Sequence, residues 1–147
     1  MIQDPVEIIR DAILRGVERP EIVRAATACA RAVVHLAPSS NHDALAAVEA
    51  AERWTMDPSE ENTEAAFLTE RECLKLRCVK EDWNNGGDPT EAWALLSATM
   101  AGISCVTDKH LYDFTAELCV DYAARAAAGA SIDPNIDFAV IVMSVLL

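Results

Sequence analysis

The sequence predicts an all-α fold of about seven helices, packed as antiparallel helical hairpins in a bundle or a short solenoid. A helix-initiating tetrapeptide, Asp-Pro-x-Glu, occurs three times in the 147-residue chain. Between these starts, apolar residues recur at the three- and four-residue spacing of an amphipathic helix. Alanine-rich stretches such as 123–130 supply small faces that let helices approach closely.

The tetrapeptide begins at Asp4, Asp57 and Asp88. An Asp at the N-cap accepts a hydrogen bond from an unpaired backbone amide, and a Pro at the next position has no amide to leave unpaired. The Glu three residues after the cap reaches back to it and favours the positive end of the helix dipole. We therefore predict that each of the three Asp carboxylates bonds an amide two or three residues further along the chain.

These starts and the Gly and Pro stops divide the chain into helices. Gly16, Gly102 and Gly129 are expected to lie just beyond three of the helix ends. The sixth helix has an apolar stripe of bulky residues: Leu111, Phe114, Leu118 and Tyr122. The predicted helices span residues 5–15, 20–36, 42–55, 58 to about 83, 89–101, 108–128 and 134–147.

Composition favours one domain over residues 1–147, with 52% apolar residues available for its core. The net charge is −12, and it lies beyond residue 40, because residues 1–40 hold five acids and five arginines. Such an acidic chain is expected to bind neither nucleic acid nor an anionic membrane surface. The charge is interpreted either as a means of keeping an Ala-rich helical protein in solution or as a sign of a basic protein partner.

Five cysteines occur, an odd number without a C-x-x-C pair. This usage predicts small buried thiols with no disulfide and no zinc site, and therefore a reducing compartment such as the cytoplasm. A raised reactivity of Cys73 or Cys78, near three basic residues, is the alternative. The sequence predicts no signal peptide, and its longest apolar run is too short for a membrane span.

No catalytic motif is recognisable, and no cofactor is expected. The one pattern that resembles a ligand set is His110, Asp113, Glu117 and Asp121, which follow one another along one side of the sixth helix. A divalent metal accepts such nitrogen and oxygen ligands, but helical metal sites draw ligands from several helices, and no second helix here repeats the pattern. A solvated helix face is the preferred interpretation, and a metal site remains the alternative.

The C-terminal segment 136–147 contains ten apolar residues out of twelve. Its β-branched content also suits a strand, but Asp133-Pro134 precedes it as a helix start and no partner strand is visible. A helix with almost no polar face is expected to be buried. We predict that the preceding helices enclose it, with coverage by a second copy as the alternative.

Several blocks resemble a family of small bacterial helical proteins of unknown function. The most specific block is Trp54–Asn62, which reads W-T-M-D-P-S-E-E-N, and it is followed by Ala65–Phe67 and by A-W-A-L-L at Ala92–Leu96. The chain departs from the family at Arg24-Ala25, where relatives often have a Trp pair. The resemblance implies bacterial origin, no established activity, and relatives that occur near secretion-system genes.

These observations favour a non-enzymatic helical protein that acts through protein–protein contacts, as an accessory or adaptor of a larger bacterial assembly such as a secretion system. The first alternative is a small metal-binding protein or enzyme that uses the face of His110, Asp113 and Glu117. The second is an obligate homo-oligomer with a C-terminal interface.

Overall fold

The computed structural model describes residues 4–37, 41–79, 89–108, 111–130 and 138–146, with residues 76–79 and 89 described by their backbone alone. The described residues form seven α-helices and one short 3₁₀ turn, and no strand, which confirms the predicted all-α class. The elements are α1 (Pro5–Leu14), α2 (Arg19–Val33), η1 (Val34–Leu36), α3 (Asn41–Met56), α4 (Glu60–Val79), α5 (Pro89–Val106), α6 (Tyr112–Ala130) and α7 (Phe138–Leu146).

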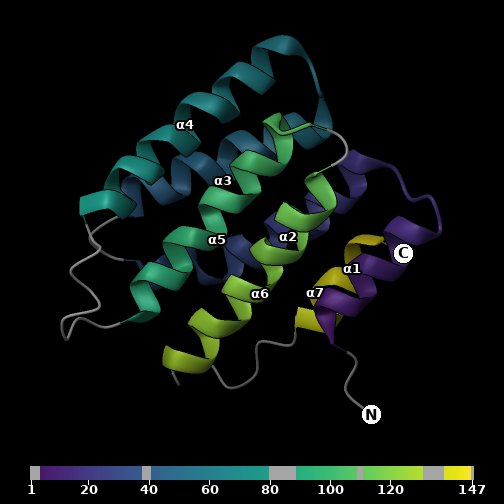
Figure 1. Ribbon diagram of the computed structural model, residues 1–147. Helices are drawn as coiled ribbons and strands as arrows, with labels where there is room; N and C mark the ends of the chain where they lie inside the picture. The colour runs from purple at the N-terminus through teal and green to yellow at the C-terminus, as the bar shows by residue number, and fades with distance from the viewer. Residues whose placement is uncertain (1–3, 38–40, 80–88, 109–110, 131–137, 147) are drawn as a thin grey trace.

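The helices form two layers (Figure 1). Helices α4, α5 and α6 run back and forth beside one another in the front layer, with α5 between the other two. Helices α3, α2, α1 and α7 form the layer behind, where α2 and α3 pack against the inner side of α5. Every residue of α5 from Thr90 to Val106 is buried or half-buried, because four helices and η1 pack around it. No helix in the described ranges has both the length and the apolar character needed to cross a bilayer.

The three predicted caps have different outcomes. Asp4 is the N-cap of α1, and its Oδ1 accepts a hydrogen bond from the amide of Val6 at 2.9 Å, as predicted. The prediction for Asp57 is wrong, because the hydroxyl of Ser59 accepts the bond from the amide of Asn62 at 3.2 Å. Helix α4 therefore begins two residues later than the sequence predicts. Asp88 lies outside the described residues.

Two of the three predicted stop glycines lie inside helices. Gly16 does end α1, with a φ of +84° that favours glycine. Gly102 and Gly129 are instead internal residues of α5 and α6. A Cβ at Gly102 would lie 2.8 Å from the Cβ of Glu70 on α4. Glycine at this position is therefore required by the close approach of α4 and α5, and the prediction that it ends the fifth helix is wrong.

Small side chains form the core at the α5–α6 interface. Helix α6 buries a face of small and β-branched residues, namely Thr115, Ala116, Cys119, Val120, Ala123 and Ala126. The predicted apolar stripe is only half confirmed, since Leu118 and Tyr122 are half-buried and Tyr122 stacks on Trp93, but Leu111 and Phe114 are 56% and 61% exposed. The Ser97 hydroxyl donates to the Cys119 carbonyl at 2.7 Å across this interface. Because short side chains fill the interface, the helices approach closely and the bulky residues of α6 remain outside.

Arg19, at the start of α2, binds the carbonyl end of α5. Its Nη2 donates to the backbone oxygens of Ser104 and Thr107 at 2.7 and 2.8 Å, and its Nε donates to Ser104 at 3.2 Å. The guanidinium carbon also lies 5.4 Å from the ring centroid of Trp54 on α3 and 5.0 Å from that of Tyr112 on α6. The last carbonyls of a helix have no partner within it, so one side chain satisfies them and joins four helices.

The C-terminal helix is only partly buried. Helix α7 packs against α1 and α2 through Phe138, Ala139 and Val142. Its opposite side is open, with Val140 59% and Met143 38% exposed. The prediction that the bundle encloses this segment as a central element is therefore wrong. Helix α5 occupies the central position instead, and its small residues are what allow four helices and η1 to pack around it.

The close approach at Gly102 generates a stability prediction. Gly102→Ala is expected to destabilise the protein by about 1–3 kcal/mol, because the new Cβ meets the Glu70 Cβ and not a flexible chain end. Gly129→Ala is the matched control. Its Cβ would lie 2.7 Å from the hydroxyl oxygen of Thr90, which is the end of a side chain that can turn away, whereas the Cβ of Glu70 is fixed to its backbone. The gain in helix propensity of about 1 kcal/mol also opposes the contact at Gly129. Urea unfolding followed by circular dichroism should separate the two variants, and equal changes would contradict this packing.

The Arg19 bonds generate a second stability prediction. Arg19→Lys keeps the charge but loses the planar fork that reaches two carbonyls and stacks on two rings. We expect a loss of about 2 kcal/mol in the free energy of unfolding. Arg15→Lys is the control, since Arg15 makes an exposed ion pair with Asp11 in which either cation serves. A similar, small effect in both variants would show that the carbonyl end of α5 does not depend on Arg19.

Candidate functional site

The predicted acidic stripe of α6 does not form a ligand set in the described part of the chain. Glu117 forms an ion pair with Arg10 of α1, with 2.8 Å between Oε1 and Nε. Asp121 forms one with Arg125, with 2.9 Å between Oδ2 and Nε. The Oδ1 of Asp113 accepts the amide of Phe114 at 2.9 Å. His110 lies outside the described residues. Across the described ranges, no three His, Cys, Asp or Glu side chains converge as metal ligands, so the carboxylates of Glu117 and Asp121 serve ion pairs.

The described cysteines are buried thiols. Cys29, Cys73, Cys105 and Cys119 are free and buried, in agreement with the sequence prediction for them. Burial raises the pKa of Cys73 to about 12, far from the range of a reactive thiolate. The Cys73 thiol donates to the backbone oxygen of Asp43 at 3.4 Å, which joins α4 to α3. The side chain of Cys78 lies outside the described residues.

The block Trp54–Asn62 forms a tight elbow between α3 and α4. The indole Nε1 of Trp54 donates to the hydroxyl of Thr63 at 3.0 Å, and the Thr63 hydroxyl donates to the Ser59 carbonyl at 2.8 Å. The side-chain amide of Asn62 donates to the Asp57 carbonyl at 2.7 Å. Trp54, Ser59 and Asn62 of the most specific sequence block therefore help to fix the turn, whereas Glu60 and Glu61 are exposed. Trp54 is buried, as a helix-junction anchor.

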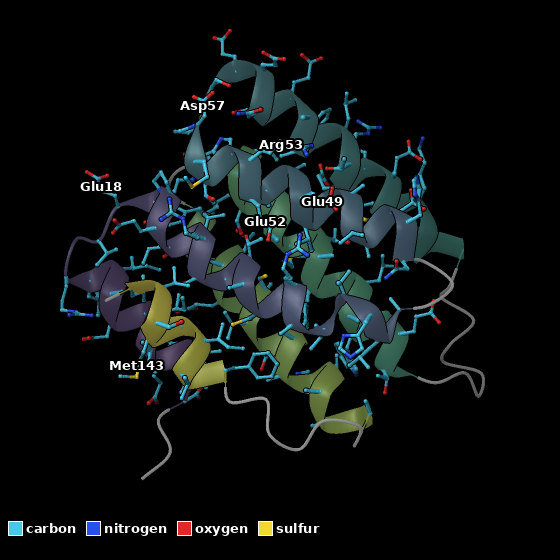
Figure 2. The ribbon with its side chains drawn as sticks, turned by 180° about the vertical axis from the view of Figure 1, so that it is seen from behind. Glu18, Glu49, Glu52, Arg53, Asp57 and Met143 are labelled. Carbon is cyan, nitrogen blue, oxygen red and sulfur yellow. The ribbon has the colours of Figure 1, made fainter. Side chains whose placement is uncertain are left out.

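A hollow of about 480 Å³ lies on the outer side of this elbow, lined by Glu49, Glu52, Arg53, Met56, Asp57 and Asn62. Figure 2 shows the labelled side chains of α3 and Asp57 on the back of the molecule. Glu52 is held by Arg31 of α2, whose Nη2 donates to its Oε1 at 2.7 Å. The hollow is thus shallow and charged, and one of its carboxylates, Glu52, is already paired with Arg31. Its side chains do not converge on one point.

A second groove, of about 430 Å³, lies on the other side of the elbow, between α4 and α5. It is lined by Glu60, Thr63, Glu64, Phe67 and Val106. The ring of Phe67 is 40% exposed and forms its apolar wall together with Val106. Glu60 and Glu64 are exposed carboxylates at its rim. This groove combines an apolar floor with an acidic edge, which is the arrangement of a protein-docking groove.

The groove continues onto an apolar outer side of the front layer. Helix α5 carries a single charged residue, Glu91, over its whole length. Met100, Ile103 and Val106 of α5 are half-buried apolar residues, whereas the ring of Trp93 is covered by Tyr122 and Arg125 of α6. On the flanking helices, Phe67 and Leu68 of α4 and Phe114 of α6 are exposed, and so is Leu111, which directly precedes α6. We call the outer surface of α4, α5 and α6 the front face.

Basic residues in the described ranges are largely engaged within the protein. Five form ion pairs with acids, namely Arg10, Arg15, Arg31, Lys75 and Arg125. Arg19 and Arg24 donate to backbone carbonyls. By contrast, Glu60, Glu61 and Glu64 make no ion pair with any described residue. The excess negative charge is therefore exposed, and part of it lies beside the groove.

Glu70 is a buried carboxylic acid one turn beyond Phe67. It is 5% exposed, and its Oε2 accepts no hydrogen bond from the described residues. Desolvation raises the pKa of Glu70, and the charge of neighbouring Arg71 opposes this only in part. The Cβ of Glu70 packs on Gly102 in the α4–α5 interface, the contact that excludes a side chain at Gly102. Its acid group therefore belongs to the core beneath the groove.

No protein-family model, curated protein sequence or solved structure matches this chain. The resemblance noted in the sequence is thus a hypothesis, and the candidate site depends on geometry and charge alone.

Sequence reasoning did not identify the front face. Its residues follow ordinary helical spacing, which is read as a core stripe when the packing partners are unknown. The signal available was the size of the residues on each side of α6. The small side is continuous, and close-packed helices prefer to bury that side.

Glu70 generates a pH-dependent prediction. Because its folded pKa is raised above the unfolded value of about 4.3, the ionised acid destabilises the folded state at pH 7. This penalty disappears as pH falls through the folded pKa. Glu70→Gln should therefore be more stable than wild type at pH 7, by about 1 kcal/mol, and the difference should shrink toward pH 4.

Thermal melts at several pH values measure this difference. Glu72→Gln is the control, since Glu72 is exposed and pairs only with Lys75. It should change stability little across the pH range. A Glu70→Gln variant that is less stable than wild type at pH 7 would mean that the ionised carboxylate is stabilised in the folded protein.

Proposed function

We propose that this protein is a non-enzymatic helical adaptor that binds a partner protein through its front face. The observation that carries the proposal is the exposure of large apolar residues on α4 and α6, the two helices that flank α5, with Phe67 and Phe114 as the aromatic members. Apolar side chains that gather on one face indicate an interaction surface, whereas singly scattered ones do not. Exposed aromatic residues are also the type that most often dominates binding energy.

The resemblance to a family of small bacterial helical proteins supports a role as an accessory of a larger bacterial assembly, such as a secretion system. The four buried free cysteines support a place in the reducing cytoplasm. No group of converging reactive side chains in the described ranges favours catalysis or metal binding.

A second candidate is self-association through α7. Val140 and Met143 are exposed on the outer side of this helix, which carries no charged residue from Phe138 to Leu146. A second copy covering this face would make the protein a homo-oligomer. Light scattering of wild type and of Val140→Ser decides this candidate, because only an α7 interface would make the variant smaller in solution.

Affinity capture from the native host tests the adaptor proposal. Wild-type protein should retain a specific partner, and Phe114→Ser should recover about tenfold less of it, because a 61% exposed ring can be lost without loss of core packing. Leu14→Ser is the matched control, since Leu14 is 82% exposed on α1, in the other layer. The proposal fails when both variants recover the same proteins in the same amounts as wild type.

A further inference from the structure

The groove between α4 and α5 has a chemistry that selects one kind of partner. We infer that it binds a basic amphipathic helix of another protein, whose apolar side chains contact Phe67 and Val106 and whose Lys or Arg side chains face Glu60 and Glu64. This inference rests on the proposed function and adds the partner's chemistry and the place where it docks.

The apolar half of the site consists of one exposed ring and one α5 side chain. Phe67 is 40% exposed, whereas Ala66 and Cys73 on the same helix are fully buried. Its neighbour Leu68 is more exposed but does not line the groove. An amphipathic helix inserts apolar residues into a groove between two helices at three- and four-residue spacing.

The charged half of the site contains acidic residues and no basic residue from the start of α4 to Glu70. Glu60, Glu61 and Glu64 precede Phe67, and the first basic residue of the helix is Arg71. The guanidinium of Arg71 lies 5.4 Å from the Phe67 ring centroid and so marks the end of the acidic segment. Carboxylates that form no ion pair with the described residues attract a basic partner and disfavour an acidic one.

The same charges argue against other occupants. A second copy would bring Glu60 and Glu64 toward an equally acidic surface, in a protein of net charge −12. An anionic lipid surface and a nucleic-acid backbone would be repelled for the same reason. A basic protein helix is the class of partner that the apolar floor and the acidic rim both favour.

The test uses a synthetic peptide of roughly 18 residues, about five helical turns, with Leu on one face and Lys on the other. Fluorescence anisotropy measures its binding to the full chain at physiological salt. A peptide of the same composition in scrambled order removes the apolar face, and a peptide with Glu in place of Lys removes the positive charge. We expect binding of the first peptide, with about tenfold weaker binding of each control.

Matched protein variants locate the binding. Phe67→Ser should weaken binding about tenfold, and Leu14→Ser, an exposed position on α1 in the other layer, should leave binding within about twofold of wild type. Glu60→Gln with Glu64→Gln should weaken binding and reduce its salt dependence. Glu18→Gln with Glu21→Gln, which removes two exposed charges around the start of α2, should do neither.

Three results would overturn the inference. The scrambled peptide or the Glu peptide binds as well as the first, the two serine variants behave alike, or Phe67→Ser alters the mass of the free protein, which would identify a second copy as the occupant. Circular dichroism checks that each variant is folded. Partner capture that depends on Phe114 while these peptide results fail would leave the adaptor proposal standing without this groove.

Discussion

The carbonyl groups at the end of α5 lie inside the bundle and require donors, and the arrangement of the other helices depends on how that requirement is met. Arg19 brings the start of α2 to this end and places its guanidinium against Trp54 of α3 and Tyr112 of α6. Burial lowers the pKa of Arg19, yet guanidinium remains charged well above neutral pH. The two layers are thus joined at one end by the Arg19 guanidinium, which is partly desolvated but donates hydrogen bonds to two backbone carbonyls.

The second constraint is the size of the residues that the layers bury. Ala, Gly and Cys occupy much of the contact between α5 and its neighbours, and Gly102 and Gly129 allow backbones to approach within contact of Glu70 and Thr90. Bulky side chains do not fit between helices this close. Phe67, Leu111 and Phe114 are consequently left outside. The packing of the core is therefore sufficient to explain why the front face is apolar, whether or not a partner binds there.

The helix content was predictable because Asp-Pro caps and helical periodicity are local signals. The face that each helix buries was less predictable, because it depends on partners. Periodicity assigned the bulky residues of α6 to the apolar stripe, whereas the size of the neighbouring helix face decided the packing. Gly102 shows the same limit, since glycine ends helices and also permits close approach, and only the position of Glu70 distinguishes the two. The groove residues could not be inferred, because α4 and α5 contribute them separately.

The exposed carboxylates at the start of α4 have a kinetic consequence. Charges that are free in water extend their field over about 8 Å at physiological ionic strength, so they act on an approaching molecule before any contact forms. For the proposed basic partner, they would raise the rate of encounter, whereas the ring of Phe67 would act only at contact and would set how long the complex lasts. The acidic rim and the apolar floor would therefore govern separate steps, arrival and residence.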